Sequence, residues 1–328
     1  MQTAIIKAIK YALATFFAIF IAQWLGLEYA VTAGIIAILS LAETNRATVL
    51  YIEQIAITML LSLGTAWLLF PLLDYNIWVF SLYLLIAYPL AVLFKSQRAI
   101  APCAVSVSHL LIEETVAFDW LLNEFLLLII GTVLALLVNL YQPSKNKIIL
   151  AKQAEVENLI RQILNEFSDQ LANGDNFYEN SGRLDDLTLM IRQAINLAEE
   201  EEANRLSKTS FYYREYFEMR NQQTRILYEI DASLHEVGAA IPQHQALADF
   251  MQATSQQLHE SNTGRQLKAD LRKIRDYYSQ SPLPKSRQEF EERAILFEIL
   301  QDCQKFLDIK ASFYRHVQSM DRHFSNRD

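Results

Sequence analysis

The charged residues of this chain are distributed so unevenly that they divide it into two parts with different solvent preferences. The first 144 residues contain 5 Lys and Arg and 8 Asp and Glu, whereas the remaining 184 contain 24 and 29. Long apolar segments with few charges are typical of membrane spans, and charge-rich segments are typical of soluble domains. We therefore expect a transmembrane domain at residues 1–143 and a cytosolic domain at residues 144–328.

The transmembrane part contains six apolar segments. They cover approximately residues 8–25, 29–42, 48–70, 77–94, 99–112 and 120–141. Four are long enough to cross a hydrocarbon core of ~30 Å. The second and fifth, with about 14 residues each, would reach only ~21 Å as helices. We expect neighbouring protein or local thinning of the bilayer to support these two short helices.

The positions of Lys and Arg predict the orientation of the spans, because basic residues are enriched in cytoplasmic connections. Basic residues precede the first segment, lie between the second and third and between the fourth and fifth, and follow the sixth: Lys7, Lys10, Arg46, Lys95, Arg98, Lys145, Lys147 and Lys152. The other three connections contain acidic residues and no basic residue. This alternation predicts a multi-pass protein of the cell membrane with both termini in the cytoplasm.

The segment lengths follow the order long, short, long twice. This order predicts two three-helix halves of opposite orientation. Inverted repeats with short, interrupted helices in matching positions occur in secondary transporters, where they mark the binding region. Gly34 and Pro102 are the predicted interruptions of the second and fifth helices. The alternative is that these two segments are simply short buried helices.

The cytosolic part is predicted to be all-α and most consistent with a helical bundle. Residues 183–237 contain no Gly or Pro and are expected to form one long helix or two stacked helices. A capping box of Ser286 and Glu289 predicts the start of the last helix. Its apolar seam has a regular three–four spacing typical of coiled-coil packing, and it contains Leu296, Ile299, Cys303, Phe306, Lys310, Phe313, Val317 and Met320.

Several classes of activity and partner are not supported by motifs in the chain. There is no Walker A loop, zinc-protease motif or nucleophile elbow, so we expect neither an enzyme nor a protein with a metal or cofactor. The net charge is −8 and no basic patch suggests nucleic acid. The expected partners are the lipid bilayer, a small organic anion and further copies of the chain, because short spans need neighbours.

Ionisable groups in the transmembrane part are the main candidate functional residues, because they are costly there unless they are paired or functional. Glu53 and His109 are candidates for coupling to protons. The alternatives are an interfacial carboxylate paired with Arg46 and a structural, hydrogen-bonded histidine. Arg46 and Arg98 could attract an anionic substrate at the cytosolic mouth, or they could serve only the charge asymmetry. Weaker candidates are Gln23, Asn45, Glu124 and Asn139.

Four stretches of the chain are similar to one family of bacterial membrane proteins. They are residues 34–46 (GIIAILS followed by TNR), 137–143 (LVNLYQP), 213–220 (YREYFEMR) and 283–294 (LPKSRQEFEERA). These stretches resemble the aromatic acid exporter family, which belongs to the fusaric-acid-resistance-like group, and the similarity extends over nearly the whole chain. The resemblance implies efflux of aromatic carboxylic acids, driven by an ion gradient. The alternative is a membrane-anchored helical scaffold or sensor that acts through its cytosolic domain.

Overall fold

A computed structural model describes residues 2–173, 181–205, 211–238, 241–260, 262 and 264–325. Within these residues it contains twelve α-helices, one short 3-10 helix and no strand, which confirms the prediction of an all-α protein. The helices form two compact units. The N-terminal unit comprises Met1–Pro143 with Ala203–Lys208, and the C-terminal unit comprises Ser144–Glu202 with Thr209–Asp328. Each unit is described by itself.

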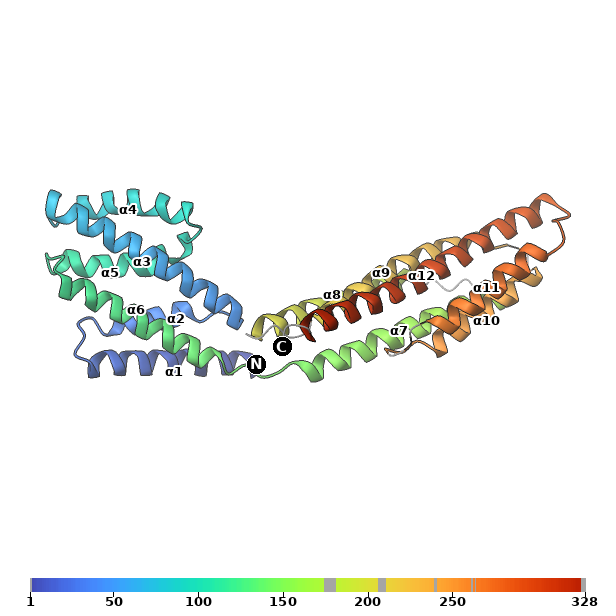
Figure 1. Ribbon diagram of the computed structural model, residues 1–328, viewed down its shortest axis with the longest axis horizontal. Helices are drawn as coiled ribbons and strands as arrows, with labels where there is room; N and C mark the ends of the chain where they lie inside the picture. The colour runs from blue at the N-terminus through green and yellow to red at the C-terminus, as the bar shows by residue number, and fades with distance from the viewer. Residues whose placement is uncertain are drawn as a thin grey trace. The chain divides into compact units, whose positions relative to one another are not determined.

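The N-terminal unit contains six helices that lie alongside one another (Figure 1). They are α1 (Gln2–Trp24), α2 (Val31–Ser40), α3 (Asn45–Leu73), α4 (Ile77–Leu93), α5 (Ile100–Ile112) and α6 (Phe118–Asn139), with a 3-10 turn η1 (Gln97–Ala99) before α5. Three of them, α1, α3 and α6, are long and apolar enough to cross a membrane. The predicted fourth full-length span is shorter than expected, because α4 has only 17 residues.

The predicted short helices are present, but their interruptions are not. α2 has 10 residues and α5 has 13, so they extend only ~15 and ~20 Å. Pro102 lies in the first turn of α5, where proline fits without breaking a helix. Gly34 lies within a continuous α2. A Cβ at Gly34 would come within 2.7 Å of Ile19 Cγ1, so this glycine allows α1 and α2 to pack closely rather than interrupting α2.

The six helices pack as two groups of three. Each group combines two helices that are consecutive in the chain with one helix from the other half of the unit. α1 and α2 pack with α6, whereas α4 and α5 pack with α3. The first group is joined by small residues, namely Ala14, Ala18, Ala22, Ala33, Ala37 and Ala135. If α1–α3 and α4–α6 correspond to each other, the two groups contain equivalent helices.

The N-terminal unit exposes many large apolar side chains on its outside, in addition to the apolar residues of its core. Trp78 is 84% exposed, and other large apolar residues on the surface include Phe16, Phe20, Trp24, Trp67, Leu72 and Leu85. An exposed apolar surface of this extent is unfavourable in water. It is the surface expected of helices that are surrounded by lipid.

The C-terminal unit consists of antiparallel helices around one apolar core (Figure 1). They are α7 (Asn146–Asn173), α8 (Ser181–Asn204), α9 (Tyr212–Glu236), α10 (Pro242–Gln256), α11 (Arg265–Gln280) and α12 (Arg287–Ser325). The last two residues of α8, Ala203 and Asn204, belong to the N-terminal unit. Residues 183–237 thus include two helices rather than one. α7 packs mainly on α10, and α9 packs mainly on α12.

The predicted start and seam of the last helix are largely confirmed. Ser286 Oγ accepts a hydrogen bond from Glu289 N at 3.1 Å, whereas the Glu289 carboxylate accepts from Lys285 N instead of Ser286 N. Six seam residues are buried: Leu296, Ile299, Cys303, Phe306, Lys310 and Phe313. Val317 packs at the edge of the core, and the Met320 side chain lies outside the described residues.

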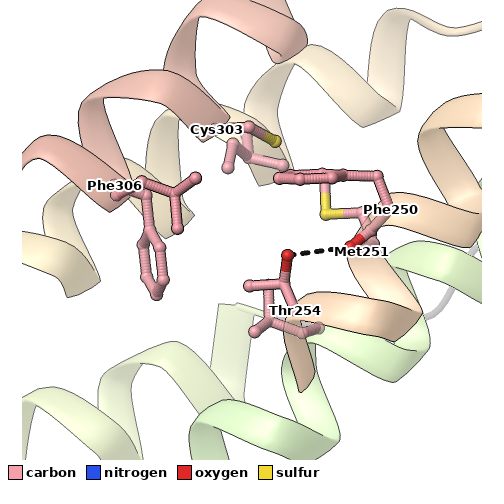
Figure 2. A pocket seen from close by; sticks show the side chains of 8 residues that line it. Phe250, Met251, Thr254, Cys303 and Phe306 are labelled. Carbon is pink, nitrogen blue, oxygen red and sulfur yellow. Dashed lines mark hydrogen bonds between the residues drawn. The ribbon is translucent and has the colours of Figure 1, made fainter. Parts of the chain in front are cut away.

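A small cavity in the core of the C-terminal unit is lined by residues of α7, α9, α10 and α12 (Figure 2). Its volume is about 10 Å³, which is close to the minimum for one water molecule. Thr254 supplies the only hydroxyl among the lining side chains, and this hydroxyl already donates to the Phe250 carbonyl at 2.8 Å. Burial raises the pKa of the neighbouring Cys303 thiol, which therefore stays protonated. This cavity is a packing defect rather than a ligand site.

Lys310 is the polar member of the α12 seam, and its side chain is only 4% exposed. Its Nζ donates to the His259 carbonyl at 2.7 Å. Burial, together with the nearby Arg220, lowers the pKa of Lys310 from 10.5 to about 7. Between pH 7 and 10.5 the unfolded chain therefore binds more protons than the folded chain. As a result, this group makes the free energy of unfolding rise as the pH increases through that window.

Replacement of Lys310 by Met should therefore stabilise the C-terminal unit. We expect a gain of about 1–3 kcal/mol at pH 7, because the desolvation cost of a buried cation is removed, and a smaller gain towards pH 10. Amide hydrogen exchange of peptides from α9 and α12 would measure both values. The exposed Lys273→Met serves as the control. A Lys310→Met variant that is less stable than the wild type at pH 7 would contradict this account.

Candidate functional site in the N-terminal unit

His109 on α5 and Glu124 on α6 form a buried pair inside the N-terminal unit. His109 Nδ1 lies 2.9 Å from Glu124 Oε1. Glu124 is fully buried, and its Oε2 has no hydrogen-bond partner among the described residues. With the carboxylate ionised, Nδ1 must carry the proton and donate it, because Glu124 can then only accept. The other ring nitrogen, Nε2, lies 3.4 Å from the Thr32 hydroxyl on α2.

The residues around this pair come from the two connections at the same end of the unit. The Tyr29 ring, in the α1–α2 connection, stacks on the His109 ring with 4.0 Å between centroids. The Tyr29 hydroxyl donates to Glu113 Oε1 at 2.7 Å, and Glu113 directly follows α5. Asn123 on α6 exchanges two hydrogen bonds with the backbone of Glu28. The site therefore connects both chain reversals with α2, α5 and α6, and we call it the His109 cluster.

The backbone of these two connections adopts uncommon conformations beside the His109 cluster. Tyr29 has φ +54° and Glu114 has φ +49°. Non-glycine residues in this left-handed region are uncommon, and such conformations cost of the order of 1–3 kcal/mol. They persist where the surrounding contacts fix them. Here the stacking of Tyr29 on His109 and the Asn123 bonds to Glu28 provide such contacts.

A second buried polar group, the Lys10 cluster, lies at the other end of the same unit. Lys10 on α1 is 9% exposed, and its Nζ donates to Asn139 Oδ1 at 3.2 Å. The Asn139 amide in turn donates to Thr48 Oγ1 at 2.8 Å and to the Ala42 carbonyl at 3.3 Å. Gln142 Nε2 also donates to Asn139 Oδ1. Asn139 and Glu124 are separated by ~22 Å along α6.

Between the two clusters, α2 packs tightly against α6. A Cβ at Gly131 of α6 would lie 2.6 Å from the Ala33 carbonyl oxygen, so only glycine fits there. α2 also carries one buried hydroxyl towards each end, namely Thr32 and Ser40. The short helix α2 therefore lies between the two polar clusters and packs tightly against α6 there.

The structure places the eight sequence candidates in different environments. His109 lies in the buried cluster that bears its name. Glu53, Arg46, Arg98 and Gln23 lie on exposed faces, and within the described residues Glu53 forms no ion pair with Arg46. Asn45 is buried, and its Nδ2 donates to the Asn204 carbonyl of the N-terminal unit at 2.7 Å. Glu124 and Asn139, the weaker candidates, contact His109 and Lys10 directly.

Sequence reasoning did not select Tyr29, Thr32 or Lys10 as site residues. A usable signal existed for Lys10, because it lies inside the first apolar segment, where an ionisable residue is costly. The charge pattern, however, predicts only a cytoplasmic position for it. No comparable signal marks Tyr29 or Thr32. Their roles depend on contacts with a residue about 80 positions away in the chain.

Comparisons with known proteins agree along the length of the chain. Residues 3–142 match the family model "Aromatic acid exporter family member 1", and residues 146–311 match "Putative aromatic acid exporter C-terminal domain". The uncharacterized protein YqjA of Bacillus subtilis (strain 168) is 30% identical over 308 residues, which cover 94% of this chain and 95% of that protein. 

One solved structure is also similar to part of the chain. It is the "Crystal structure of putative membrane protein from Clostridium difficile 630", with 24% identity and a TM-score of 0.46, and the match covers 51% of this chain and 97% of that chain. The family models and the B. subtilis relative extend over both units, and the family is one of exporters rather than enzymes. The chain is therefore a membrane protein that belongs to the aromatic acid exporter family.

Proposed function

We propose that this protein exports small aromatic carboxylic acids across the cell membrane and that a proton gradient drives the export. The family supports transport of an aromatic acid. The observation that carries the coupling is the His109–Glu124 pair, which is buried within an apolar helical unit. Buried ionisable pairs in membrane helices are expensive, and they are characteristic of proton relays.

The geometry of the pair suggests how it takes up a proton. Glu124 Oε2 has no partner among the described residues and is a free acceptor position. A histidine exchanges a proton near neutral pH. When the pair gains a proton, Nε2 of His109 becomes a donor and its interaction with Thr32 of α2 changes. Protonation is thereby linked to the short helix that lies between the two clusters.

Direction follows from the expected topology, in which both termini are cytoplasmic. The His109 cluster then lies near the outer face, about 9 Å along α6 from its first residue. A proton from outside binds to the His109–Glu124 pair, and the contacts of α2 rearrange. The organic anion then moves from the cytoplasm to the outside while the proton moves into the cytoplasm. Tight packing at Gly131 keeps the two ends from being open at the same time.

Flux measurements in proteoliposomes test this proposal. Liposomes loaded with radiolabelled 4-hydroxybenzoate should release it faster with the protein than without it, in a saturable manner, and the rate should increase when the outside is acidified. Protein-free liposomes under the same gradient measure passive loss of the weak acid. The neutral methyl ester should not be driven by the gradient.

Two other results would change the conclusion. Saturable flux that does not depend on the pH gradient would remove proton coupling and retain transport. No protein-dependent flux of 4-hydroxybenzoate, benzoate or salicylate would remove the transport proposal and favour a scaffold or sensor. The C-terminal domain, tethered to an unrelated membrane helix, would then be expected to restore the phenotype that is lost in cells without this protein.

A further inference from the structure

The ammonium group of Lys10 has no counter-ion among the described residues of the N-terminal unit. No carboxylate oxygen of the described residues lies within 4.0 Å of its Nζ, and its one recorded partner is the neutral Asn139 amide. Glu43, an acid that follows α2, pairs with Lys7 at 3.5 Å and is exposed. By contrast, the buried Arg220 of the C-terminal unit is paired with Glu157 at 2.9 Å. A buried charge that lacks a counter-ion is strongly destabilising.

The groups near Lys10 are able to donate hydrogen bonds to an anion. Thr48 Oγ1 accepts from Asn139 Nδ2 and from Ala42 N, and its own proton has no recorded acceptor among the described residues. Two positions before Ala42, the fully buried Ser40 hydroxyl also lacks a partner in the described part of the chain. Lys10 uses one of its three N–H donors on Asn139. Within the described residues, the surroundings of Lys10 therefore contain hydrogen-bond donors without acceptors and a positive charge without a negative partner.

We propose that Lys10 binds the carboxylate of the exported acid, and that the Lys10 cluster is the cytoplasmic binding site of the transporter. This inference rests on the proposed function and adds the residue that recognises the substrate. A single ammonium group matches a single carboxylate, whereas a phosphate dianion would need a second cation. Leu41, an apolar residue of the neighbouring α1–α2–α6 core, would contact the aromatic ring.

The substitution Lys10→Met removes the charge and keeps the length of the side chain. Asn139 Oδ1 retains its hydrogen bond from Gln142 at 3.1 Å, so the variant leaves no acceptor unpaired. We expect the melting temperature of the full-length protein to stay equal or rise, and the KM for 4-hydroxybenzoate efflux to increase about 10- to 100-fold. Lys10→Arg should retain most of the affinity. Inhibition by the neutral methyl 4-hydroxybenzoate should be the same in wild type and Lys10→Met.

Lys7→Met is the matched control, because Lys7 is exposed and lies one turn earlier on the same helix. It should leave the KM unchanged. A purely structural Lys10 would give the opposite pattern, namely a lower melting temperature of Lys10→Met with an unchanged KM, and this result would overturn the carboxylate assignment. If the wild type itself carries no 4-hydroxybenzoate, the proposed function fails, and the assignment fails with it.

Discussion

Glu124→Gln should abolish the gradient-driven export of aromatic acids while leaving the protein folded. The amide retains an oxygen that can accept from His109 Nδ1, and its size is nearly the same as that of the carboxylate. Because the amide carries no negative charge, it cannot stabilise a protonated His109 in the buried site. The pair therefore loses the proton uptake that couples the gradient to α2. We expect the pH-dependent component of 4-hydroxybenzoate flux in proteoliposomes to fall by roughly 10²-fold or more, the magnitude typical of a lost proton-transfer group.

Exchange between labelled and unlabelled 4-hydroxybenzoate should continue in this variant, because exchange needs substrate binding but no net proton movement. Asp119→Asn is the matched control: Asp119 lies five residues earlier on α6 and is exposed. Glu53→Gln examines the other carboxylate that the sequence suggested, and because Glu53 is exposed we expect little effect. Gradient-driven flux that survives Glu124→Gln and disappears in Glu53→Gln would contradict the assignment of the coupling site.

The positions and lengths of the helices could be predicted well because local signals determine them. The two short helices α2 and α5 were recognised from the lengths of their apolar segments. The last helix was recognised from Ser286 and from the spacing of apolar residues after it. Gly34 was misinterpreted for a physical reason. A glycine within a helix weakens it but also lets another helix approach, and only the neighbour at that position, Ile19, distinguishes the two roles.

The candidate site could be predicted only in part, because its contacts join distant parts of the chain. The sequence predicts His109 as a candidate because an ionisable residue in an apolar helix is unusual, and it indicates Glu124 only as a weaker candidate of the same kind. The sequence does not show that these two side chains meet. Lys10 and Asn139 are 129 positions apart, so their contact depends on how α1 packs beside α6. Conversely, Arg46 and Arg98 drew attention as charges, although both lie on exposed faces.

Arg220→Met should produce the largest loss of stability in the C-terminal unit. The guanidinium is fully buried and donates to Glu157, Tyr216 and Gln223, each at 2.9 Å. Burial raises the pKa of the Tyr216 hydroxyl, which therefore stays protonated and donates to Glu157 at 2.6 Å. Gln223 extends the network to α12 through the Phe306 carbonyl at 2.8 Å. One side chain thus joins α7, α9 and α12.

Breaking a buried ion pair from one side costs about 3–5 kcal/mol, because the remaining charge is left without a partner. For a unit of this size, that loss should lower the melting temperature by roughly 6–20 °C. Circular dichroism and amide hydrogen exchange of peptides from α7 and α9 would measure it in the full-length protein. The exposed Arg272→Met should change stability by less than about 0.5 kcal/mol.

The double variant Arg220→Met with Glu157→Leu distinguishes a lost attraction from a stranded charge. If the cost of Arg220→Met comes mainly from leaving Glu157 buried and unpaired, removing Glu157 as well should recover about 2 kcal/mol or more, since an apolar pair of similar volume is often as stable as a buried ion pair. Arg161, which lies 3.4 Å from the other oxygen of Glu157, can compensate only in part, because it is 37% exposed. Additive losses in the double variant would instead show that the hydrogen bonds to Tyr216 and Gln223 hold the three helices together.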